Sequence, residues 1–342
     1  MRIAISAASK VRSRYSSIAI SAWAVARSGD KSHCPTKICP REGSLAEYQA
    51  RCVLAAKAEL GECPLWSVEE QCLYWIDIYG KTFNRFDPAT GQNRAWDMPA
   101  NPGSFVLREE GGVVIAMRDG IYSFDCGDEP PVKLMNAPYD PGEIRFNDGR
   151  TDRQGRYWVG SMPLGIEEEN AGVVGAFYSY DGSTLIKRIT PVHHANGTAF
   201  SLDSRTMYRS ETTDRKIFAY DYDAAAGTVS NERLFATVPP ELGMPDGATV
   251  DSEDGYWSAL PAGPNGGSIA RFAPDGKLDL VIDLPVLIGT MPAFGGPDMS
   301  TLYVTTGQLE PVVGKPVTAL SGNIFAIETK FRGVPEVKLR SK

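Results

Sequence analysis

Short apolar strands and turn residues alternate along the chain from about residue 60 to its C-terminal end. Six stretches repeat one pattern, in which an apolar strand, a turn and a second strand end near an Asp-Gly or Asp-Pro turn. They begin at Cys72, Gly112, Arg156, Thr206, Gly255 and Thr301. They recur every roughly 40–50 residues, the spacing of β-propeller blades. The repeat therefore predicts an all-β fold, a six-bladed β-propeller around a central channel.

A further short segment precedes each repeat and is expected to be the strand nearest the axis of the ring. Several of these segments carry oxygen-bearing side chains at the end that should face the channel: Glu62, Asn147 with Asp148, Asn196 and Asp246. Four blades that are far apart in sequence are therefore expected to aim such side chains at one axis.

Residues 50–57 form a predicted strand that has no blade of its own. A propeller must close its ring, and an N-terminal strand that completes the last blade would remove a free sheet edge. We predict that this strand pairs with the C-terminal strands around 322–328 and 335–340. The longer interruptions 163–175 and 308–321 are predicted to be loops at the channel mouths, where they can act as lids, and the run Glu167–Glu169 is expected to be solvated.

The first 48 residues differ in composition from the remainder. Residues 1–29 are rich in Ser and Ala, with five basic and no acidic side chains, which resembles a transit peptide or a poor secretory signal. We favour an extension without a fold of its own, disordered or cleaved, so that the propeller domain covers 49–342. Residues 1–48 carry a net charge of +5, which leaves −12 for the remainder of a chain whose total is −7.

An acidic domain is a poor partner for nucleic acid, and it suits a cation or a neutral polar ligand. No apolar run approaches the ~20 residues that span a bilayer, and nothing in the sequence calls for more than a monomer. Six cysteines are present, without a second close pair or a His partner that would complete a zinc site. Free thiols indicate a reducing compartment, so we expect a cytoplasmic protein, with the basic extension as the feature that argues otherwise.

Common catalytic motifs are missing. There are three histidines, of which His193 and His194 are expected to have a plain loop role, and neither H-E-x-x-H nor G-x-S-x-G occurs. The remaining candidates, Glu62, Asn196 and Asp246, supply oxygen only. Hard divalent cations, above all Ca²⁺, prefer such ligands and leave positions open for water or a substrate oxygen.

Six motifs in order resemble those of the regucalcin/gluconolactonase family, the senescence-marker-protein-like lactonases. They are Gly61-Glu62-Cys63-Pro64-Leu65-Trp66, Tyr74-Trp75-Ile76-Asp77, Arg145-Phe146-Asn147-Asp148-Gly149-Arg150, Asn196-Gly197, Pro245-Asp246-Gly247 and Phe294-Gly295-Gly296-Pro297-Asp298. The resemblance runs from about Tyr48 to the C-terminus and implies a six-bladed propeller with one divalent metal ion in its channel.

The resemblance also implies roles for individual residues. It assigns metal ligands to Glu62, Asn196 and Asp246 and substrate contacts to Arg145 and Asn147. It implies a hydrolase acting on carboxylic ester bonds, which converts sugar lactones to aldonic acids with Ca²⁺, Zn²⁺, Mn²⁺ or Fe²⁺.

Two departures from the family pattern stand near these motifs. Cys63 replaces the glycine that usually follows the ligand glutamate, and we expect its thiol to pack as a small hydrophobe. Arg209-Ser210-Glu211 replaces an aromatic-Thr-Asp sequence after the fourth repeat, which alters either the substrate site or only its outer layer.

Lactone hydrolysis needs a polarised carbonyl, an attacking water and stabilisation of the oxyanion, and a metal ion can answer the first and third needs. Asp246 is the predicted general base, and Asp148 is either a second base or a support for the metal site. The alternatives are a related propeller esterase or phosphotriesterase, which prefers apolar pockets, and a non-catalytic calcium-binding propeller.

Overall fold

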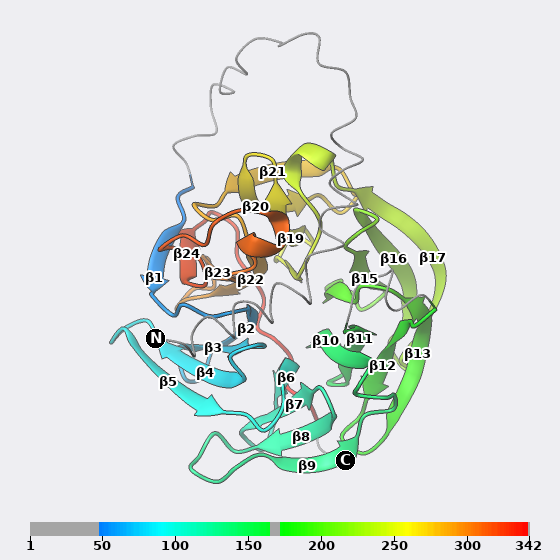
Figure 1. Cartoon of the computed structure of the whole chain (residues 1–342). Coiled ribbons are helices and arrows are strands. Elements are labelled where there is room, and N and C mark those ends of the chain that lie inside the picture. The colour runs from blue at the N-terminus through cyan, green and yellow to red at the C-terminus, as the bar shows by residue number, and fades with distance from the viewer. Residues whose placement is uncertain (1–47, 165–171, 341–342) are drawn as a thin grey trace, which may run out of the picture.

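The computed structural model describes residues 48–164 and 172–340. These residues form six antiparallel four-stranded sheets arranged as blades around one axis (Figure 1). The predicted extension 1–48, apart from Tyr48, lies outside the described residues, as does the run Glu167–Glu169. Within the described part of the chain, the helical elements are the short 3-10 turns η2 (Pro240–Leu242) and η3 (Glu310–Val313). The predicted all-β propeller is confirmed.

The first five blades are each built from four consecutive strands that follow one another from the axis outward, and the sixth takes β1 as its outermost strand. Blade 1 contains β2 (Gly61–Ser67), β3 (Cys72–Asp77), β4 (Thr82–Asp87) and β5 (Gln92–Asp97). Blade 2 contains β6 (Pro102–Leu107), β7 (Val113–Met117), β8 (Gly120–Phe124) and β9 (Val132–Asn136). Blade 3 contains β10 (Ile144–Thr151), β11 (Tyr157–Pro163), β12 (Gly175–Tyr180) and β13 (Leu185–Val192).

The second half of the ring repeats this order. Blade 4 contains β14 (Asn196–Phe200), β15 (Thr206–Glu211), β16 (Lys216–Asp223) and β17 (Thr228–Thr237). Blade 5 contains β18 (Ala248–Val250), β19 (Tyr256–Gly263), β20 (Gly266–Phe272) and β21 (Leu278–Asp283). Blade 6 contains β22 (Gly289–Gly295), β23 (Thr301–Thr306), β24 (Ile324–Glu328) and β1 (Arg51–Leu54). The six segments predicted to precede the repeats thus hold the innermost strands.

The hydrophobic core lies between neighbouring blades rather than inside any one of them. In β3, Tyr74 and Ile76 pack toward blade 2, whereas Leu73 and Trp75 pack toward blade 6. Because successive side chains of a strand point to opposite faces, a strand covered on both faces must be apolar at every position. This burial explains the continuous apolar runs of the middle strands. The outer strands β5 and β9 are largely exposed; β5 is mostly polar, whereas β9 exposes Val132 and Leu134.

Strand β1 closes the ring, because it pairs with β24 on the outside of blade 6. The expected pairing of β1 with 322–328 is therefore confirmed, but the expected pairing with 335–340 is wrong. Instead, Leu339 forms a bridge with Arg108, and its backbone N–H donates to the carbonyl of Leu107. The segment leaves blade 6 and forms hydrogen bonds with blades 2 and 3, so it does not add a strand beside β1.

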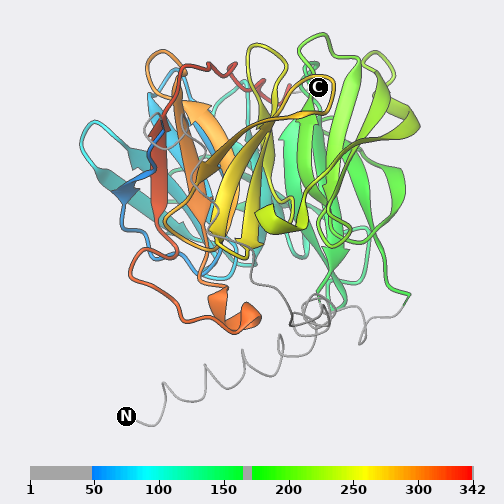
Figure 2. The ribbon, with the colours of Figure 1, turned by 90° about the horizontal axis from the view of Figure 1, so that it is seen from above.

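The C-terminal segment, residues 331–340, crosses the end of the ring where the innermost strands finish (Figure 1). It hydrogen-bonds to Leu107, to Thr151 at the end of β10, and to Ser252 just after β18. Figure 2 shows it on the opposite side of the ring from η3. The starts of the innermost strands, which carry the predicted site residues, therefore lie at the other end of the axis.

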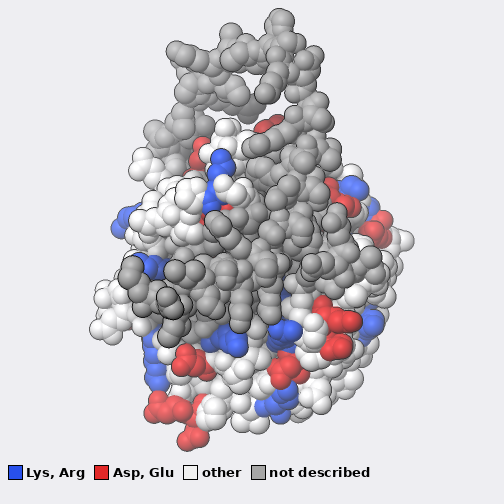
Figure 3. Space-filling view, in the orientation of Figure 1, with Lys and Arg blue, Asp and Glu red and all other residues white. Residues whose placement is uncertain are grey.

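The described surface is of mixed charge. On the face shown in Figure 3, Lys and Arg side chains alternate with Asp and Glu side chains around the ring. Within the part of the chain that the structure describes, no helix has the length and apolarity needed to cross a membrane.

Candidate active site

The innermost strands of three blades are irregular where the predicted site residues lie. The pairing register shifts within 62–65 of β2, within 146–149 of β10 and within 196–199 of β14. A β-bulge leaves residues unpaired and re-aims their side chains. In the fifth blade Asp246 stands just before β18, where its backbone N–H donates to the carbonyl of Ala259 at 2.9 Å.

Two of these irregularities require a left-handed backbone directly after a candidate ligand. Gly197 has φ 63°, and a Cβ there would lie 2.3 Å from the hydroxyl of Tyr256, so only glycine fits. Cys63 has φ 49° and keeps this conformation with a side chain. Its buried thiol donates to the carbonyl of Phe105 at 3.6 Å, and burial raises the pKa of Cys63 to about 12. The expectation that Cys63 packs in the core agrees with this burial.

Side chains from blades 3 and 4 meet in a chain of hydrogen bonds. Arg145 Nη1 donates to Asn147 Oδ1 at 2.5 Å. Asn147 Nδ2 donates to Asn196 Oδ1 at 2.6 Å and to the carbonyl of Ala195 at 2.8 Å. All three side chains belong to buried residues. The structure thus brings both predicted substrate contacts together with one predicted metal ligand.

Three carboxyl groups from different blades also lie within electrostatic reach of one another. Burial, followed by the charges of Asp246 and Asp148, raises the pKa of Glu62 well above its ordinary value. Burial, followed by the charge of Asp148, raises the pKa of Asp246 to about 8. Arg145 acts in the opposite direction on both groups. We call Glu62, Arg145, Asn147, Asp148, Asn196 and Asp246 the axial site.

Asp148 is only 6% exposed, and one of its two carboxylate oxygens has a hydrogen-bond donor. Its Oδ2 accepts the backbone N–H of Thr198 at 2.7 Å, whereas its Oδ1 has no hydrogen-bond partner. Burial raises the pKa of Asp148, and the backbone N–H of Thr198 and the charge of Arg150 counteract it. A buried carboxylate oxygen without a donor is costly unless a cation or a ligand compensates it.

The residues of the axial site suit a hard divalent cation. Among the described residues, no three His, Cys, Asp or Glu side chains form a ligand cluster by themselves. A cation would therefore combine Glu62 and Asp246 with the amide oxygen of Asn196, an oxygen set of the kind that Ca²⁺ prefers. The mutual repulsion of the carboxyl groups and the unpaired Asp148 oxygen both favour positive charge at this place.

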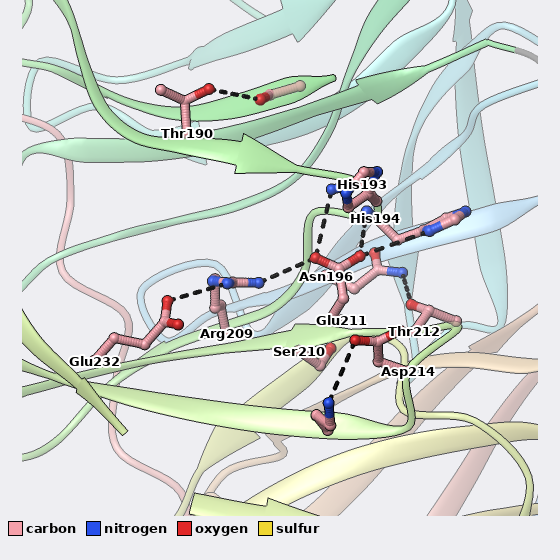
Figure 4. Close-up of polar contacts among 12 residues, drawn as sticks. Thr190, His193, His194, Asn196, Arg209, Ser210, Glu211, Thr212, Asp214 and Glu232 are labelled. Atoms are coloured by element: carbon pink, nitrogen blue, oxygen red, sulfur yellow. Dashed lines mark hydrogen bonds and ion pairs between the residues drawn. The ribbon is translucent and has the colours of Figure 1, made fainter. Parts of the chain in front are cut away.

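The structure adds residues that the sequence reasoning did not assign. Asn196 Nδ2 donates to Thr212 Oγ1 at 2.8 Å, and the carboxylate of Glu211 accepts the backbone N–H of His194 at 2.6 Å (Figure 4). Arg209 Nη1 lies 3.2 Å from Glu211 Oε2. The departure of residues 209–211 from the family pattern was the sequence signal that could have pointed to these contacts. Glu211 binds the main chain just before Asn196.

The predicted histidines lie in the segment that leads into β14. His193 is exposed, and His194 Nδ1 lies 3.7 Å from Glu211 Oε1. The four described cysteines, Cys52, Cys63, Cys72 and Cys126, are free.

Comparisons with known proteins agree with this architecture. Residues 60–308 match the family described as SMP-30/Gluconolactonase/LRE-like region. The chain is 36% identical over 292 residues to a 6-deoxy-6-sulfogluconolactonase of Pseudomonas putida, covering 84% of this chain and 97% of that protein. It is 32% identical over 297 residues to the pentonolactonase XacC of Haloferax volcanii, covering 84% and 96% respectively.

A solved structure supports the same fold. The crystal structure of a calcium-binding protein, regucalcin, from Agrobacterium tumefaciens superposes with a TM-score of 0.77 at 22% identity. The match covers 86% of this chain and 98% of that one.

Proposed function

Because the chain belongs to the SMP-30/gluconolactonase/LRE-like family, we propose that it hydrolyses a sugar lactone to the corresponding aldonic acid at the axial site. The observation that carries the proposal is the meeting of Glu62, Asp148 and Asp246 from three separate blades, with raised carboxyl pKa values and an unpaired buried oxygen. Related proteins named for lactonase activity cover most of the chain and support the same reaction.

A divalent cation, with Ca²⁺ first and Zn²⁺, Mn²⁺ or Fe²⁺ as alternatives, would be held by Glu62, Asn196 and Asp246. When bound, it would act as a Lewis acid that polarises the lactone carbonyl and stabilises the oxyanion. Asp148 would support the site from behind, because its Oδ2 already holds the backbone of Thr198 at the start of blade 4.

Substrate orientation falls to Arg145 and Asn147. The guanidinium group of Arg145 carries several fixed donors that match the hydroxyl groups of a sugar ring. Asn147 donates both of its amide N–H groups to Ala195 and Asn196, so it offers a sugar hydroxyl the second lone pair of its Oδ1. This polar lining favours a polyol over the aryl esters or phosphotriesters of the alternative propeller hydrolases, which need apolar contact.

The chemical step is the addition of water to the lactone carbonyl. Asp246 accepts a proton from the attacking water as its oxygen bonds to the carbonyl carbon. The ring C–O bond then breaks, and the leaving alkoxide takes up the proton, so that the products are a hydroxyl group and a carboxylic acid, which ionises. Asp148 is the second candidate for the base, although its hydrogen bond to Thr198 suits a supporting role better.

The test is a lactonase assay that follows acid release, with glucono-, pentono- and 6-deoxy-6-sulfogluconolactone, and a phosphotriester as the competing class. We expect turnover of at least one lactone, loss of activity after chelation and recovery on addition of Ca²⁺ or Mn²⁺. Full activity in the chelated protein contradicts the metal role, and turnover of the phosphotriester alone contradicts the substrate class.

A further inference from the structure

The hydrogen-bond chain of the axial site continues beyond Asn196 and has a single direction. Arg145 donates to Asn147 at 2.5 Å, Asn147 donates to Asn196 at 2.6 Å, and Asn196 donates to Thr212 Oγ1 at 2.8 Å. Figure 4 shows the last of these bonds, between the start of β14 and the end of β15. Four side chains from two blades are thus linked donor to acceptor.

Arg145 determines the direction of this chain, because a guanidinium group only donates. Asn147 must turn its oxygen toward Arg145, so its amide nitrogen faces Asn196. If the amide of Asn196 turned over, two NH₂ groups would face each other at the 2.6 Å now spanned by a hydrogen bond. Asn196 therefore points its oxygen at Asn147 and its nitrogen at Thr212.

Thr212 is the acceptor that completes this arrangement. Asn196 is 8% exposed, so its amide nitrogen would be left unpaired in a nearly buried place without the Thr212 hydroxyl. An amide oxygen has two lone pairs, of which Asn147 uses one and leaves the other for a cation.

Glu211 holds the main chain on the other side of Asn196. Its Oε1 accepts the backbone N–H of His194 at 2.6 Å, and its Oε2 lies 3.4 Å from the backbone nitrogen of His193. Arg209 keeps the carboxylate in place from behind. The adjacent residues Glu211 and Thr212 thus fix the backbone before Asn196 and the side chain of Asn196 itself.

We propose that Thr212 is a positioning residue: its hydroxyl holds the amide of Asn196 in the orientation that Arg145 and Asn147 determine, with the amide oxygen presented to the metal ion. The inference rests on the proposed function, since it takes Asn196 as a metal ligand. Nothing in the chemistry of threonine singles it out from the sequence alone, and its role follows from the direction of the hydrogen-bond chain.

The experiment compares Thr212→Val, which removes the hydroxyl but keeps the shape, with Thr212→Ser, which keeps the hydroxyl. Ca²⁺ binding to the chelated protein is measured by calorimetry, and the unfolding of the metal-free protein is recorded for each variant. Loss of a partner that orients a ligand weakens metal binding by about 10–100-fold. We expect Thr212→Val to fall in this range, Thr212→Ser to bind nearly as the natural chain does, and all metal-free proteins to unfold alike.

The variant Asn196→Ala distinguishes the role of Asn196 as a metal ligand from the role of Thr212 as its positioning residue. Wild-type Ca²⁺ affinity in Thr212→Val, together with loss of binding in Asn196→Ala, overturns the positioning role and leaves the lactonase proposal standing. Undiminished binding in Asn196→Ala overturns the ligand assignment and the positioning role with it. Equal weakening in Thr212→Val and Thr212→Ser also overturns the role of the hydroxyl.

Discussion

Buried carboxylates occur both in the axial site and in turns at the opposite end of the ring, and the protein treats the two groups differently. Asp251 is fully buried, and each of its oxygens has two donors. Oδ1 accepts two backbone N–H groups, and Oδ2 accepts Trp257 Nε1 and Arg271 Nε, both at 2.7 Å. Asp152 in the corresponding turn of blade 3 is satisfied in the same way by Arg156, Tyr222 and backbone N–H groups.

The axial carboxyl groups have far fewer protein donors. Asp148 leaves one oxygen without a partner. Within 48–164 and 172–340, Glu62 Oε2 accepts a 3.2 Å hydrogen bond from the backbone N–H of Cys63. Burial, followed by the charges of Asp246 and Asp148, raises the pKa of Glu62. Fully hydrogen-bonded carboxylates stabilise the fold. Buried carboxylates that lack donors destabilise it until a cation or a ligand compensates their charge.

The largest expected effect is on turnover, from Asp246→Ala. The substitution removes a proposed cation ligand and base, and Lewis-acid catalysis contributes several kcal/mol, so kcat/KM should fall by ~10³ or more. The unfolding free energy of the metal-free protein should stay within about 1 kcal/mol, because a repelling charge is lost. A lactonase assay and denaturant titration check both results.

The matched control for this variant is Asp298→Ala, which removes an exposed turn carboxylate and should leave turnover unchanged. If Asp246→Ala keeps more than about a tenth of the activity, which corresponds to ~1.4 kcal/mol of the barrier, its assigned role is wrong.

Asp251→Ala should have the opposite effect: it should lower the stability of the fold and leave turnover nearly unchanged. It leaves Arg271 buried without its main partner, and breaking a buried ion pair costs about 3–5 kcal/mol of stability. Activity per folded molecule should remain close to that of the natural chain. Denaturant unfolding measures the loss, and Asp275→Ala at an exposed turn is the control. A loss below about 1 kcal/mol would place Asp251 with ordinary surface residues.

Removal of the metal ion tests the same contrast in the natural chain and in both variants. At free Ca²⁺ about 100 times Kd, binding should stabilise the folded protein by about 2.7 kcal/mol, and chelation should remove this gain. Unfolding curves with and without Ca²⁺ should differ for the natural chain and for Asp251→Ala, but coincide for Asp246→Ala. A Ca²⁺ effect that survives in Asp246→Ala would locate the cation elsewhere.

The smallest expected effect concerns Glu211, a satisfied carboxylate beside the axial site. Burial raises its pKa, but hydrogen bonds from His194 and the charge of Arg209 outweigh burial and lower the pKa from 4.5. A lowered pKa stabilises the fold above the unfolded value, and this contribution is lost as the pH falls through the folded value. Glu211→Gln should therefore cost about 1–3 kcal/mol near pH 7.

The pH dependence supplies the control for that prediction. The difference between Glu211→Gln and the natural chain should shrink once the pH falls below 4.5. Unfolding titrations of both proteins at a series of pH values measure it. A constant difference at all pH values would mean that the charge of Glu211 contributes nothing.

The features that the sequence predicted correctly are those that depend on a few neighbouring residues. The turn residues and apolar strands indicated six blades, because strand propensity and turn chemistry act over a few neighbouring residues. Glu62, Asn196 and Asp246 became candidate ligands because they stand at equivalent points of the repeat, and their role as ligands stays a prediction. The segment 335–340 was assigned to the wrong partner, because a short segment of alternating apolar and charged residues after the last repeat does not reveal which blade it hydrogen-bonds to.

By itself, the order of residues determined the number of blades, the strands that face the axis and the chemical types gathered there. Tertiary structure alone decided which carboxylates have hydrogen-bond donors, and which way the amide of Asn196 points, with its oxygen toward Asn147 and its nitrogen toward Thr212. The reason is that hydrogen-bond direction and electrostatic coupling depend on distances between blades, and those distances exist only after the ring has closed.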